Sequence, residues 1–374
     1  MGTRPEAIKM APVVAELRAH HAFEPVVVAT GQHRQMLDQV LEIFEIVPEF
    51  DLNLMTAGQT LTGLTARLLM SLERIWTEAR PDLVLVQGDT TSTFVAGLVA
   101  YYLKIPVGHV EAGLRTQDKY APFPEEMNRR LTDVLTDYFF APTTLAREHL
   151  IREGVPDSRI WVTGNTGIDA LLYTIQRNRE TSFQPVGLPA ALSEYRQLIL
   201  VTAHRRESFG PGMKNICEAL RVIAERCPHA AILYPVHLNP NVQEPVSQLL
   251  QGIPNVFLTR PLDYRSFAHV MARSDLILTD SGGIQEEAPT FGIPVLVMRE
   301  VTERVEAITG GTAEMVGTST RLIVERTLAL LSSPRPSSPP PNPFGDGNAA
   351  QRIVAALDTE CADPADSLAG ALAF

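Results

Sequence analysis

Short, continuous apolar runs alternate with longer stretches of helical periodicity along most of this chain. The longer stretches include Leu61–Ala79, Met213–Cys227 and Ser319–Ser332. Because the apolar runs are not interrupted by polar residues, they are typical of strands buried on both faces. Their alternation with helices predicts an α/β protein with parallel sheets and right-handed crossovers. The apolar runs are Pro25–Ala29, Leu83–Gln87, Pro106–Val110, Tyr138–Ala141, Ile160–Val162, Leu198–Thr202, Ile232–Val236, Val256–Leu258, Leu276–Thr279 and Val295–Met298.

A polar, weakly periodic stretch near residues 175–197 interrupts this pattern. The chain has 374 residues, and at about 150 residues a domain this length favours two or three domains. The interruption therefore predicts two Rossmann-like domains, at 1–175 and 197–333, with a cleft between them. One large sheet is the alternative interpretation.

The C-terminal part of the sequence has a different character. The proline-rich run Ser332–Pro343 cannot form a helix and is expected to be a surface loop. Residues 344–357 are expected to close the fold with a helix at Ala349–Leu357. Small and acidic residues dominate 358–374, which we interpret as a mobile tail.

Composition narrows the classes of partner. The net charge is −11 and no basic block offsets it, which argues against nucleic acid and anionic membranes. An anionic small molecule remains compatible, since local basic groups can bind it. The three cysteines form no Cys-x-x-Cys pair, which favours reduced thiols in the cytoplasm. Uncharged runs fall short of the roughly 20 residues of a membrane span.

Candidate chemistry in the first half follows the predicted strands, where open α/β sheets place their ligand crevice. The chain start enters a helix with Arg4 and Lys9 near free backbone N–H groups, which suits a phosphate. Asp89, Glu111 and Glu125 follow the next strands and could converge. Carboxylates that lie close together repel one another when ionised, which raises the pKa of one of them. That carboxylate can then serve as an acid or base near neutral pH. Ordinary helix capping is the alternative interpretation of these segments.

In the second half, His204, Arg205 and Arg206 follow a strand and bring an imidazole and two guanidinium groups to its end. The turn Asp280–Gly283 joins another strand to a helix. Its glycines allow close backbone approach, and the following N–H groups can hold a diphosphate. Glu287, further along that helix, can accept two ribose hydroxyls.

Several common signatures are absent from the sequence. No Gly-x-Gly-x-x-Gly follows a predicted strand, so NAD is not supported. There is no Walker Gly-Lys-Ser/Thr, and Thr279 occupies the position where a nucleophile elbow around Ser281 would need glycine. No metal-ligand spacing of histidines or cysteines is present, and we expect no cofactor.

Taken together, these segments resemble the non-hydrolysing UDP-N-acetylglucosamine 2-epimerases from Gly2 to about Leu357. The resemblance implies two Rossmann-like domains of the glycosyltransferase-B type, a homodimer, a UDP-sugar substrate and the cytoplasm. It is carried by Gly2-Thr3-Arg4-Pro5-Glu6-Ala7-Ile8-Lys9, Gly88-Asp89-Thr90, His109-Val110-Glu111-Ala112-Gly113, Pro124-Glu125-Glu126, Thr163-Gly164-Asn165, His204-Arg205-Arg206-Glu207, Asp280-Ser281-Gly282-Gly283 and Pro343-Phe344-Gly345-Asp346-Gly347.

The resemblance also implies roles for individual residues. Arg4 and the Ser-Gly-Gly turn would hold the diphosphate, Glu287 the ribose, and Phe267 would lie near uracil. A second UDP-sugar site beside the catalytic one is a further candidate, although Gly58 stands where some members have arginine. The implied catalytic positions are Lys9, Asp89, Glu111, Glu125 and His204; the turn is Ser281, Gly282 and Gly283; the second site is Gln32, Gln35, Arg205 and His237.

The chemistry of such an epimerase constrains its mechanism. The proton on C2 of the sugar is not acidic, and the chain lacks the NAD fingerprint that oxidation at C3 would need. The remaining route expels UDP from C1 as C2 loses its proton, and UDP then re-adds with the proton on the other face. The residues leave open which acid serves which face. Alternatives are a hydrolysing relative, an epimerase of a decorated UDP-sugar, a glycosyltransferase of the same fold and an inactive UDP-sugar-binding protein.

One departure from that family concerns the chain start. Its members usually have a short apolar strand before Gly-Thr-Arg-Pro, whereas this sequence begins at the motif. We expect either a start assigned too far downstream or a first domain without one central strand. A missing strand would leave neighbouring backbone groups unpaired and would loosen Arg4 and Lys9.

Overall fold

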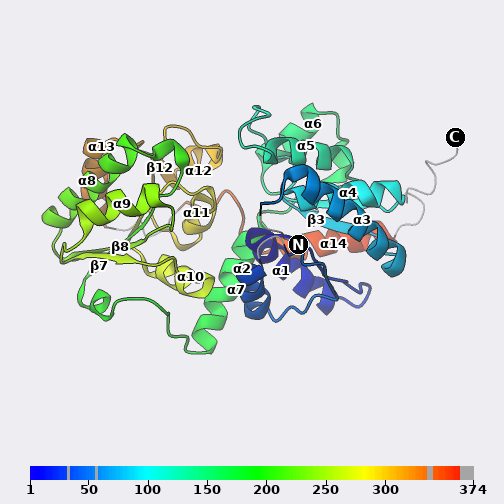
Figure 1. The fold of residues 1–374 in the computed structure, drawn as a ribbon, viewed down its shortest axis with the longest axis horizontal. Coiled ribbons are helices and arrows are strands. Elements are labelled where there is room, and N and C mark those ends of the chain that lie inside the picture. Colours follow the sequence, from blue (N-terminus) through cyan, green and yellow to red (C-terminus); the bar gives the residue numbers. More distant parts are fainter. Residues whose placement is uncertain (32–33, 55–57, 335–339, 363–374) are drawn as a thin grey trace. The chain divides into compact units, whose positions relative to one another are not determined.

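The computed structural model describes residues 1–31, 34–54, 58–334 and 340–362. The chain divides into two compact units (Figure 1). The first unit is Met1–Ala170 together with the chain from Phe344 onward, and the second unit is Leu171–Pro343. Both units are α/β with parallel strands, which confirms the predicted fold class.

The main sheet of the first unit is parallel, in the order β3-β4-β5-β6, and β1 and β2 form a separate parallel pair. The N-terminal ammonium of Met1 donates to the Val28 carbonyl at 2.8 Å, and the Thr30 N–H donates to the Met1 carbonyl at 2.8 Å. Met1 thus pairs with the β1 backbone. The elements are α1 (Arg4–Ala19), β1 (Val28–Ala29), α2 (Arg34–Ile43), β2 (Phe50–Asp51), α3 (Leu61–Ala79), β3 (Val84–Gln87), α4 (Thr91–Tyr102), β4 (Val107–Val110), α5 (Glu125–Val134), β5 (Tyr138–Ala141), α6 (Thr144–Arg152), η1 (Asp157–Arg159), β6 (Ile160–Val162) and, near the C-terminus, α14 (Ala349–Ala362).

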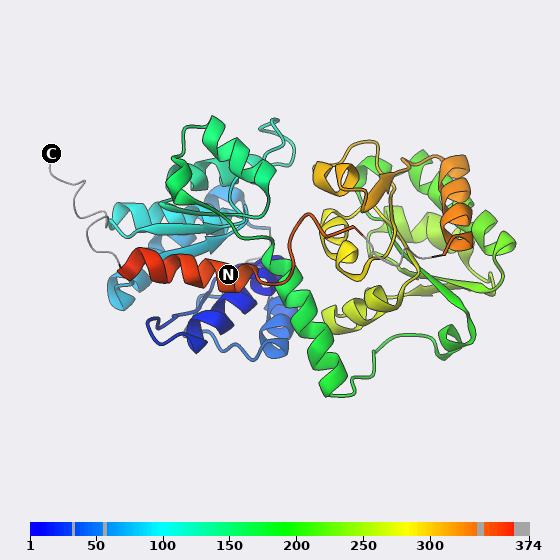
Figure 2. The same cartoon turned by 180° about the vertical axis from the view of Figure 1, so that it is seen from behind.

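The last described helix, α14, returns to the first unit and packs beside α1 (Figure 2). Its apolar side chains Ile353 and Leu357 share a buried cluster with Met10 and Val13 of α1. The Asp169 carboxylate accepts the Ala350 N–H at 2.8 Å and so fixes the start of α14. The two ends of the chain therefore build one face of the first unit together.

The second unit has a six-stranded parallel sheet in the order β12-β11-β10-β7-β8-β9. Helix α8 contacts both α9 and α13 on one face, and α10 lies on the other (Figure 1). Helix α7 (Thr166–Glu180) runs from the first unit into the second. The other elements are η2 (Ala190–Glu194), β7 (Gln197–Thr202), η3 (Arg206–Ser208), α8 (Pro211–Arg226), β8 (Ala230–Pro235), α9 (Pro240–Leu250), β9 (Val256–Thr259), α10 (Tyr264–Arg273), β10 (Leu276–Thr279), α11 (Gly282–Glu287), η4 (Ala288–Phe291), β11 (Val295–Val297), α12 (Val305–Thr309), β12 (Ala313–Met315) and α13 (Thr320–Ser332).

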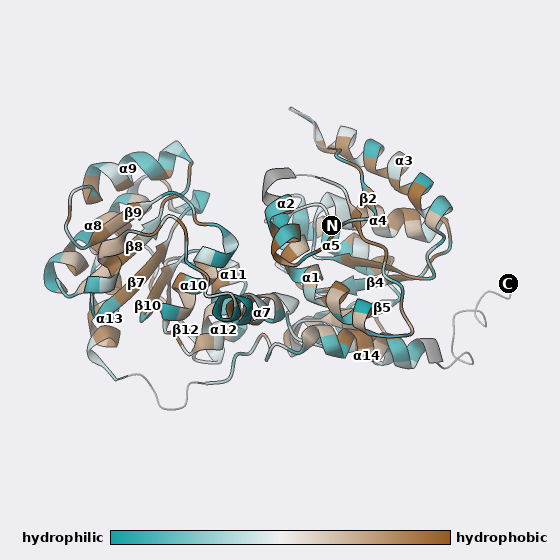
Figure 3. Cartoon of the chain, turned by 90° about the horizontal axis from the view of Figure 1, so that it is seen from below, coloured by the Kyte–Doolittle hydropathy of each residue, from teal (hydrophilic) through white to brown (hydrophobic). Residues whose placement is uncertain are grey.

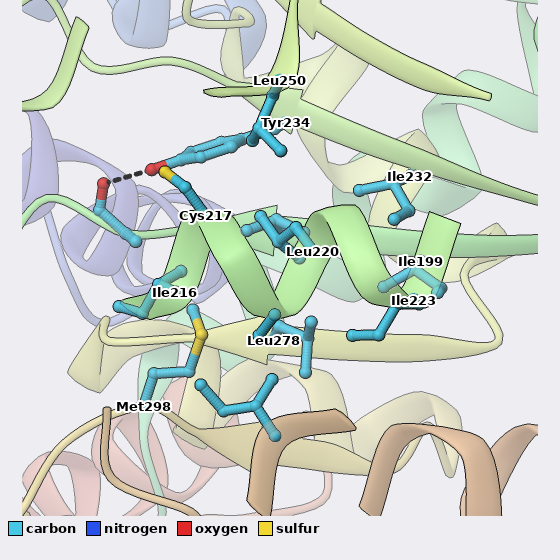
Figure 4. Packing of buried hydrophobic residues seen from close by; sticks show 14 of the residues in the cluster. Ile199, Ile216, Cys217, Leu220, Ile223, Ile232, Tyr234, Leu250, Leu278 and Met298 are labelled. Atoms are coloured by element: carbon cyan, nitrogen blue, oxygen red, sulfur yellow. Dashed lines mark hydrogen bonds between the residues drawn. The ribbon is translucent and has the colours of Figure 1, made fainter. Parts of the chain in front are cut away.

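The core of the second unit follows from the spacing of apolar residues in α8. Ile216, Leu220 and Ile223 recur at three and four residues and face the sheet (Figure 4). The strands of the sheet present apolar side chains to this helix. Strands β7, β8 and β10 are coloured as hydrophobic in Figure 3. Tyr234 is fully buried, and its hydroxyl donates to the Ala203 carbonyl at 2.8 Å, so burial of this polar group is compensated.

Each apolar run predicted as a strand contains one, although some ends differ. Strand β1 is only Val28–Ala29 because Pro25 has no N–H to donate and Val26 is half exposed. The sequence analysis missed β2 and β12, which are two and three residues long.

The C-terminal boundary also differs from the expectation. Helix α14 continues to Ala362, past the predicted end at Leu357, because no glycine or proline interrupts the chain before Pro364. The start of the predicted tail is therefore helical, and its remainder, 363–374, lies outside the described residues. Within the described part of the chain, no helix is long and apolar enough to cross a membrane.

The connection after β4 passes close under α6. Gly113 has a φ of +86°, and a Cβ there would overlap the carbonyl oxygen of Ala146. Gly154 has a similar φ of +90°, but no atom lies within 4 Å of its Cβ position. A side chain would therefore strain the backbone at both positions, but it would also clash with a neighbouring atom only at Gly113.

We therefore expect Gly113→Ala to lower the free energy of unfolding more than Gly154→Ala does. The strain common to both is roughly 1–2 kcal/mol, and overpacking adds roughly 1–3 kcal/mol at Gly113. Urea unfolding of both variants against the parent measures the difference. Equal losses would show that Gly113 is required only for its backbone conformation.

Candidate functional site

The first helical turn of α1 is held by one buried carboxylate. Glu6 is 5% exposed, and its Oε2 accepts the N–H groups of Gly2 and Thr3 at 3.1 and 2.7 Å. Its Oε1 accepts the hydroxyls of Thr90 and Thr93 at 3.0 and 3.1 Å. Glu6 therefore joins the predicted phosphate-binding segment to the turn after β3.

Glu111 and Lys9, predicted from separate segments, form an ion pair. Their side chains are 10% and 17% exposed, so the pair is largely shielded from water. The other carboxylate oxygen of Glu111 accepts the side-chain amide of Gln87. Glu111 has a φ of +72°, a left-handed conformation that is uncommon for a residue with a side chain and occurs at functional sites.

Asp89 is held by helix α5. Its carboxylate pairs with Arg129, and its backbone carbonyl accepts the Asn128 side-chain amide at 3.0 Å. Glu125 is the first residue of this same helix and is half-buried. The structure thus links the turn that carries Asp89 to the helix that carries Glu125.

The adjacent acids Glu125 and Glu126 differ in environment. Glu126 is fully buried, and its Oε2 accepts the Thr116 N–H at 3.1 Å. It therefore fixes the connection between β4 and α5. Glu126 thus has a structural role, and Glu125 remains the candidate site acid of the two.

In the second unit, a buried aspartate organises the end of β7. Asp280 Oδ2 accepts the N–H groups of His204 and Arg205 at 2.6 and 2.7 Å, and its Oδ1 lies 3.0 Å from His204 Nδ1. Burial alone would raise the pKa of Asp280, but the hydrogen bond and charge of His204 and the Arg205 N–H hold that pKa below its usual value. His204 remains 37% exposed, so its ring is both oriented and accessible.

His237, at the end of β8, stacks on His204 with ring centroids 5.5 Å apart and planes 21° apart. Partial burial lowers the pKa of His237, and the neighbouring His204 lowers it further. Arg205 is adjacent to His204 in the chain. The structure therefore gathers His204, Arg205 and His237, two of which were predicted for a second UDP-sugar site.

The Ser-Gly-Gly turn starts α11. The Ser281 N–H donates to the Thr279 hydroxyl at 2.9 Å. A Cβ on Gly282 would lie 3.0 Å from Cζ of Arg304, whose guanidinium pairs with Glu286 at 2.8 Å. Glycine at 282 thus has a packing reason in addition to the expected approach of a ligand, whereas Gly283 has open space at its Cβ position.

The remaining predicted residues are dispersed over the elements. Arg4 is the first residue of α1 and Glu287 the last of α11. Phe267 lies half-buried in α10. Gln32 and the side chain of Gln35 lie outside the described residues. Among the residues that the structure does describe, no group of three His, Cys, Asp or Glu is arranged to hold a metal ion.

The sequence analysis did not assign the partners that hold the predicted acids and His204. Gln87, Arg129 and Asp280 contact Glu111, Asp89 and His204, respectively. Each pair is separated by 24 or more residues along the chain, so no local spacing reports it. The only feature of the sequence that points to these partners is their position at strand ends. Gln87 ends one apolar run, and Asp280 directly follows another.

Comparison with known proteins identifies the class. The two α/β units with parallel sheets are Rossmann-like domains of the glycosyltransferase-B type, as in the solved structures this chain resembles. The family model described as UDP-N-acetylglucosamine 2-epimerase matches residues 15–358. The chain belongs to the UDP-N-acetylglucosamine 2-epimerase family, which confirms the resemblance found in the sequence.

Individual relatives are similar over nearly their full length. A UDP-N-acetylglucosamine 2-epimerase from Yersinia pestis is 53% identical, over 95% of this chain and 96% of the relative. The Neisseria meningitidis enzyme, solved with UDP-GlcNAc, is 45% identical with a TM-score of 0.86, covering 96% of this chain and 98% of that one. An S. aureus structure with UDP is 45% identical, with a TM-score of 0.84 and coverages of 96% and 95%.

Proposed function

We propose that this chain interconverts UDP-GlcNAc and UDP-ManNAc, as a non-hydrolysing, NAD-independent 2-epimerase. Its family membership and a relative solved with UDP-GlcNAc support the substrate. The observation that carries the chemistry is Glu111, a shielded carboxylate in a left-handed backbone conformation between Lys9 and Gln87. A carboxylate held in this way is suited to proton transfer at a fixed point.

The proposed reaction has two halves. In the first, the C1–O bond breaks with its electron pair leaving on UDP, while C2 loses its proton to a carboxylate, and a C1=C2 double bond forms. In the second, UDP re-adds to C1 and a proton returns to the other face of C2. Asp89, Glu111 and Glu125 supply the proton-transfer groups, and Lys9 lies beside Glu111. No hydride carrier is needed because C2 loses and regains its hydrogen as a proton and no step of this route transfers a hydride.

We assign binding of the diphosphate to Ser281, Gly282 and Gly283 with Arg4, and a supporting charge to His204. Backbone N–H groups and cations stabilise the charge that develops on departing UDP. His204 suits this role because Asp280 orients it while its ring stays partly exposed. In the same proposal, Glu287 binds the ribose and Phe267 lies near uracil.

We also propose a second UDP-sugar site that includes Gln32, Gln35, Arg205 and His237. The stacking of His237 on His204 supports it, because the ring of a second-site residue then contacts that of a phosphate-binding residue. A ligand on one ring would thereby influence the other.

The proposed function is tested by incubating the protein with UDP-GlcNAc in deuterated water. We expect UDP-ManNAc to appear by NMR, with deuterium at C2 of product and recovered substrate. Free ManNAc with UDP would indicate a hydrolysing enzyme instead. Unchanged substrate without deuterium would indicate a binding protein, and would overturn the proposal.

The catalytic assignment predicts that Asp89→Asn, Glu111→Gln and Glu125→Gln each lower turnover by about 100-fold or more, the scale of general acid–base catalysis. The variants keep the shape of each side chain, so the proteins should stay folded, with lower melting temperatures where an ion pair is lost, at Asp89 and Glu111. Glu78→Gln, at an exposed acid of helix α3, is a control that removes an acid from the same unit away from these turns. Near-parental turnover in all three variants would contradict the assignment.

We further propose that the enzyme is a cytoplasmic homodimer. Helices α3 and α4 of the first unit support a contact with a second copy, because they expose Met70 and Tyr102 by 71% and 66% beside an apolar hollow of about 210 Å³. Large exposed apolar side chains that gather in this way mark interaction surfaces. The hollow is lined by Leu69, Met70, Glu73, Val99, Tyr102 and Leu103.

Charge placed on this surface should disrupt such a dimer. We expect Met70→Glu combined with Tyr102→Glu to shift the molecular mass in light scattering from dimer to monomer. Val47→Glu, at an apolar residue 76% exposed elsewhere in the first unit, is the matched control. A dimer that persists in the double variant would place the interface on another surface.

A further inference from the structure

A fully buried histidine lies between the turns that carry two of the proposed catalytic acids. His109 is in β4 and is 0% exposed. Its Nδ1 lies 2.6 Å from Asp133 Oδ1, and its Nε2 lies 2.7 Å from the Gly88 carbonyl oxygen. The ring therefore spans from helix α5 to the turn after β3.

The partners of this ring define its protonation state. The Gly88 carbonyl can only accept, so Nε2 carries a proton. Asp133 Oδ2 accepts from Arg115 at 2.7 Å and from the Gly113 N–H at 3.3 Å. Burial alone would raise the pKa of Asp133, but the charge and hydrogen bond of His109, followed by those of Arg115, hold the pKa below its usual value. The hydrogen bonds from Arg115 and Gly113 mark Asp133 as an ionised acceptor whatever the state of the ring, and an acceptor 2.6 Å from Nδ1 calls for a proton on that nitrogen.

Both ring nitrogens donate, which makes His109 a buried imidazolium. The charge of the ring is balanced by Asp133. The fully buried Arg115 side chain, which also pairs with Asp133, is balanced in turn by Glu153 at 2.6 Å. Two cations, His109 and Arg115, therefore face two carboxylates, Asp133 and Glu153. Such pairing is what a buried charge requires.

The segments that this cluster joins are those of the proposed proton transfers. Gly88 directly precedes Asp89, and a Cβ on Gly88 would lie 3.7 Å from the Glu111 carboxylate. Glu111 stands between His109 and Gly113, both of which contact Asp133. The ring of His109 thus connects the two acid-bearing turns without itself reaching the surface.

We propose that the His109 imidazolium, held by Asp133, is a positioning group that sets the Gly88 carbonyl, and with it Asp89, relative to Glu111. This inference rests on the proposed epimerase function. It gives a residue that cannot touch substrate a part in the C2 proton transfer. Small misplacements of reacting groups are costly, since about 1 Å can lower a rate by about 100-fold.

The first test uses the parent protein and needs no activity. With ¹⁵N-labelled histidine, we expect one side chain whose two ring nitrogens both carry slowly exchanging protons. This signal should be lost in His109→Gln. A neutral His109 tautomer, with only one nitrogen protonated, would overturn the proposal. This measurement stands even if the protein proves not to be an epimerase.

The second test is kinetic. Glutamine cannot donate to both partners in the geometry of the ring, so His109→Gln should lower kcat by about 10- to 100-fold and slow deuterium incorporation at C2 equally, with KM within about twofold. Asp133→Asn should act similarly, and the double variant should lose little more than either single variant, because the two residues act as one unit.

A control separates positioning from general stability. Leu72→Ala, in the core of the same unit and outside the cluster, should lower the melting temperature without lowering kcat. If His109→Gln keeps the kcat of the parent protein, His109 does not position the acids. If Leu72→Ala lowers kcat in step with its loss of stability, the effect of His109→Gln on kcat reflects stability alone. Failure of the epimerase proposal itself is distinguished because the parent protein would then form no UDP-ManNAc from UDP-GlcNAc.

Discussion

The turns at the carboxyl ends of parallel strands leave backbone N–H groups that must find acceptors, and buried carboxylates supply these acceptors in both units. Glu6 accepts two such groups at the start of α1, and Asp280 accepts two after β7. Glu126 and Asp133 each accept one between β4 and α5. An unpaired buried N–H costs roughly 1–3 kcal/mol, so these carboxylates determine which turn conformations are stable.

This arrangement has a consequence for the candidate site. A carboxylate that fixes a turn also fixes the side chains that the turn carries. Asp280 presents His204, and Asp133 restrains the segment that carries Glu111. The groups proposed to bind and react are therefore oriented by acids that are themselves out of contact with solvent, and orientation before binding is what electrostatic catalysis requires.

The sequence predicted the strands better than it predicted contacts. Strands buried on both faces leave a continuous apolar signal, which is why Tyr138–Ala141 and Leu276–Thr279 were found with the correct ends. Strands β2 and β12 were missed because Phe50–Asp51 and Ala313–Met315 each include an acidic residue and form no continuous apolar run. Asp89 and Glu111 were predicted because they follow apolar runs.

The partners of these acids could not be predicted, because no periodicity connects residues on different elements. Arg129 lies 40 residues from Asp89, and Lys9 lies 102 residues from Glu111. Only the parallel order of the strands brings the ends of β3 and β4 together. Contacts of this kind follow from the topology as a whole, and a sequence read one segment at a time does not contain them.

The paired charges also explain how a chain with a net charge of −11 can suit an anionic ligand. In the first unit, Glu111 and Asp89 are matched by Lys9 and Arg129. In the second, the Asp280 carboxylate accepts the backbone N–H groups of His204 and Arg205. Acids that are neutralised by their neighbours repel a diphosphate little, because opposite charges a few ångströms apart largely cancel beyond the Debye length of about 8 Å. The acidic surplus then lies in the remainder of the chain, and it does not oppose the anion binding proposed for the turns at the strand ends.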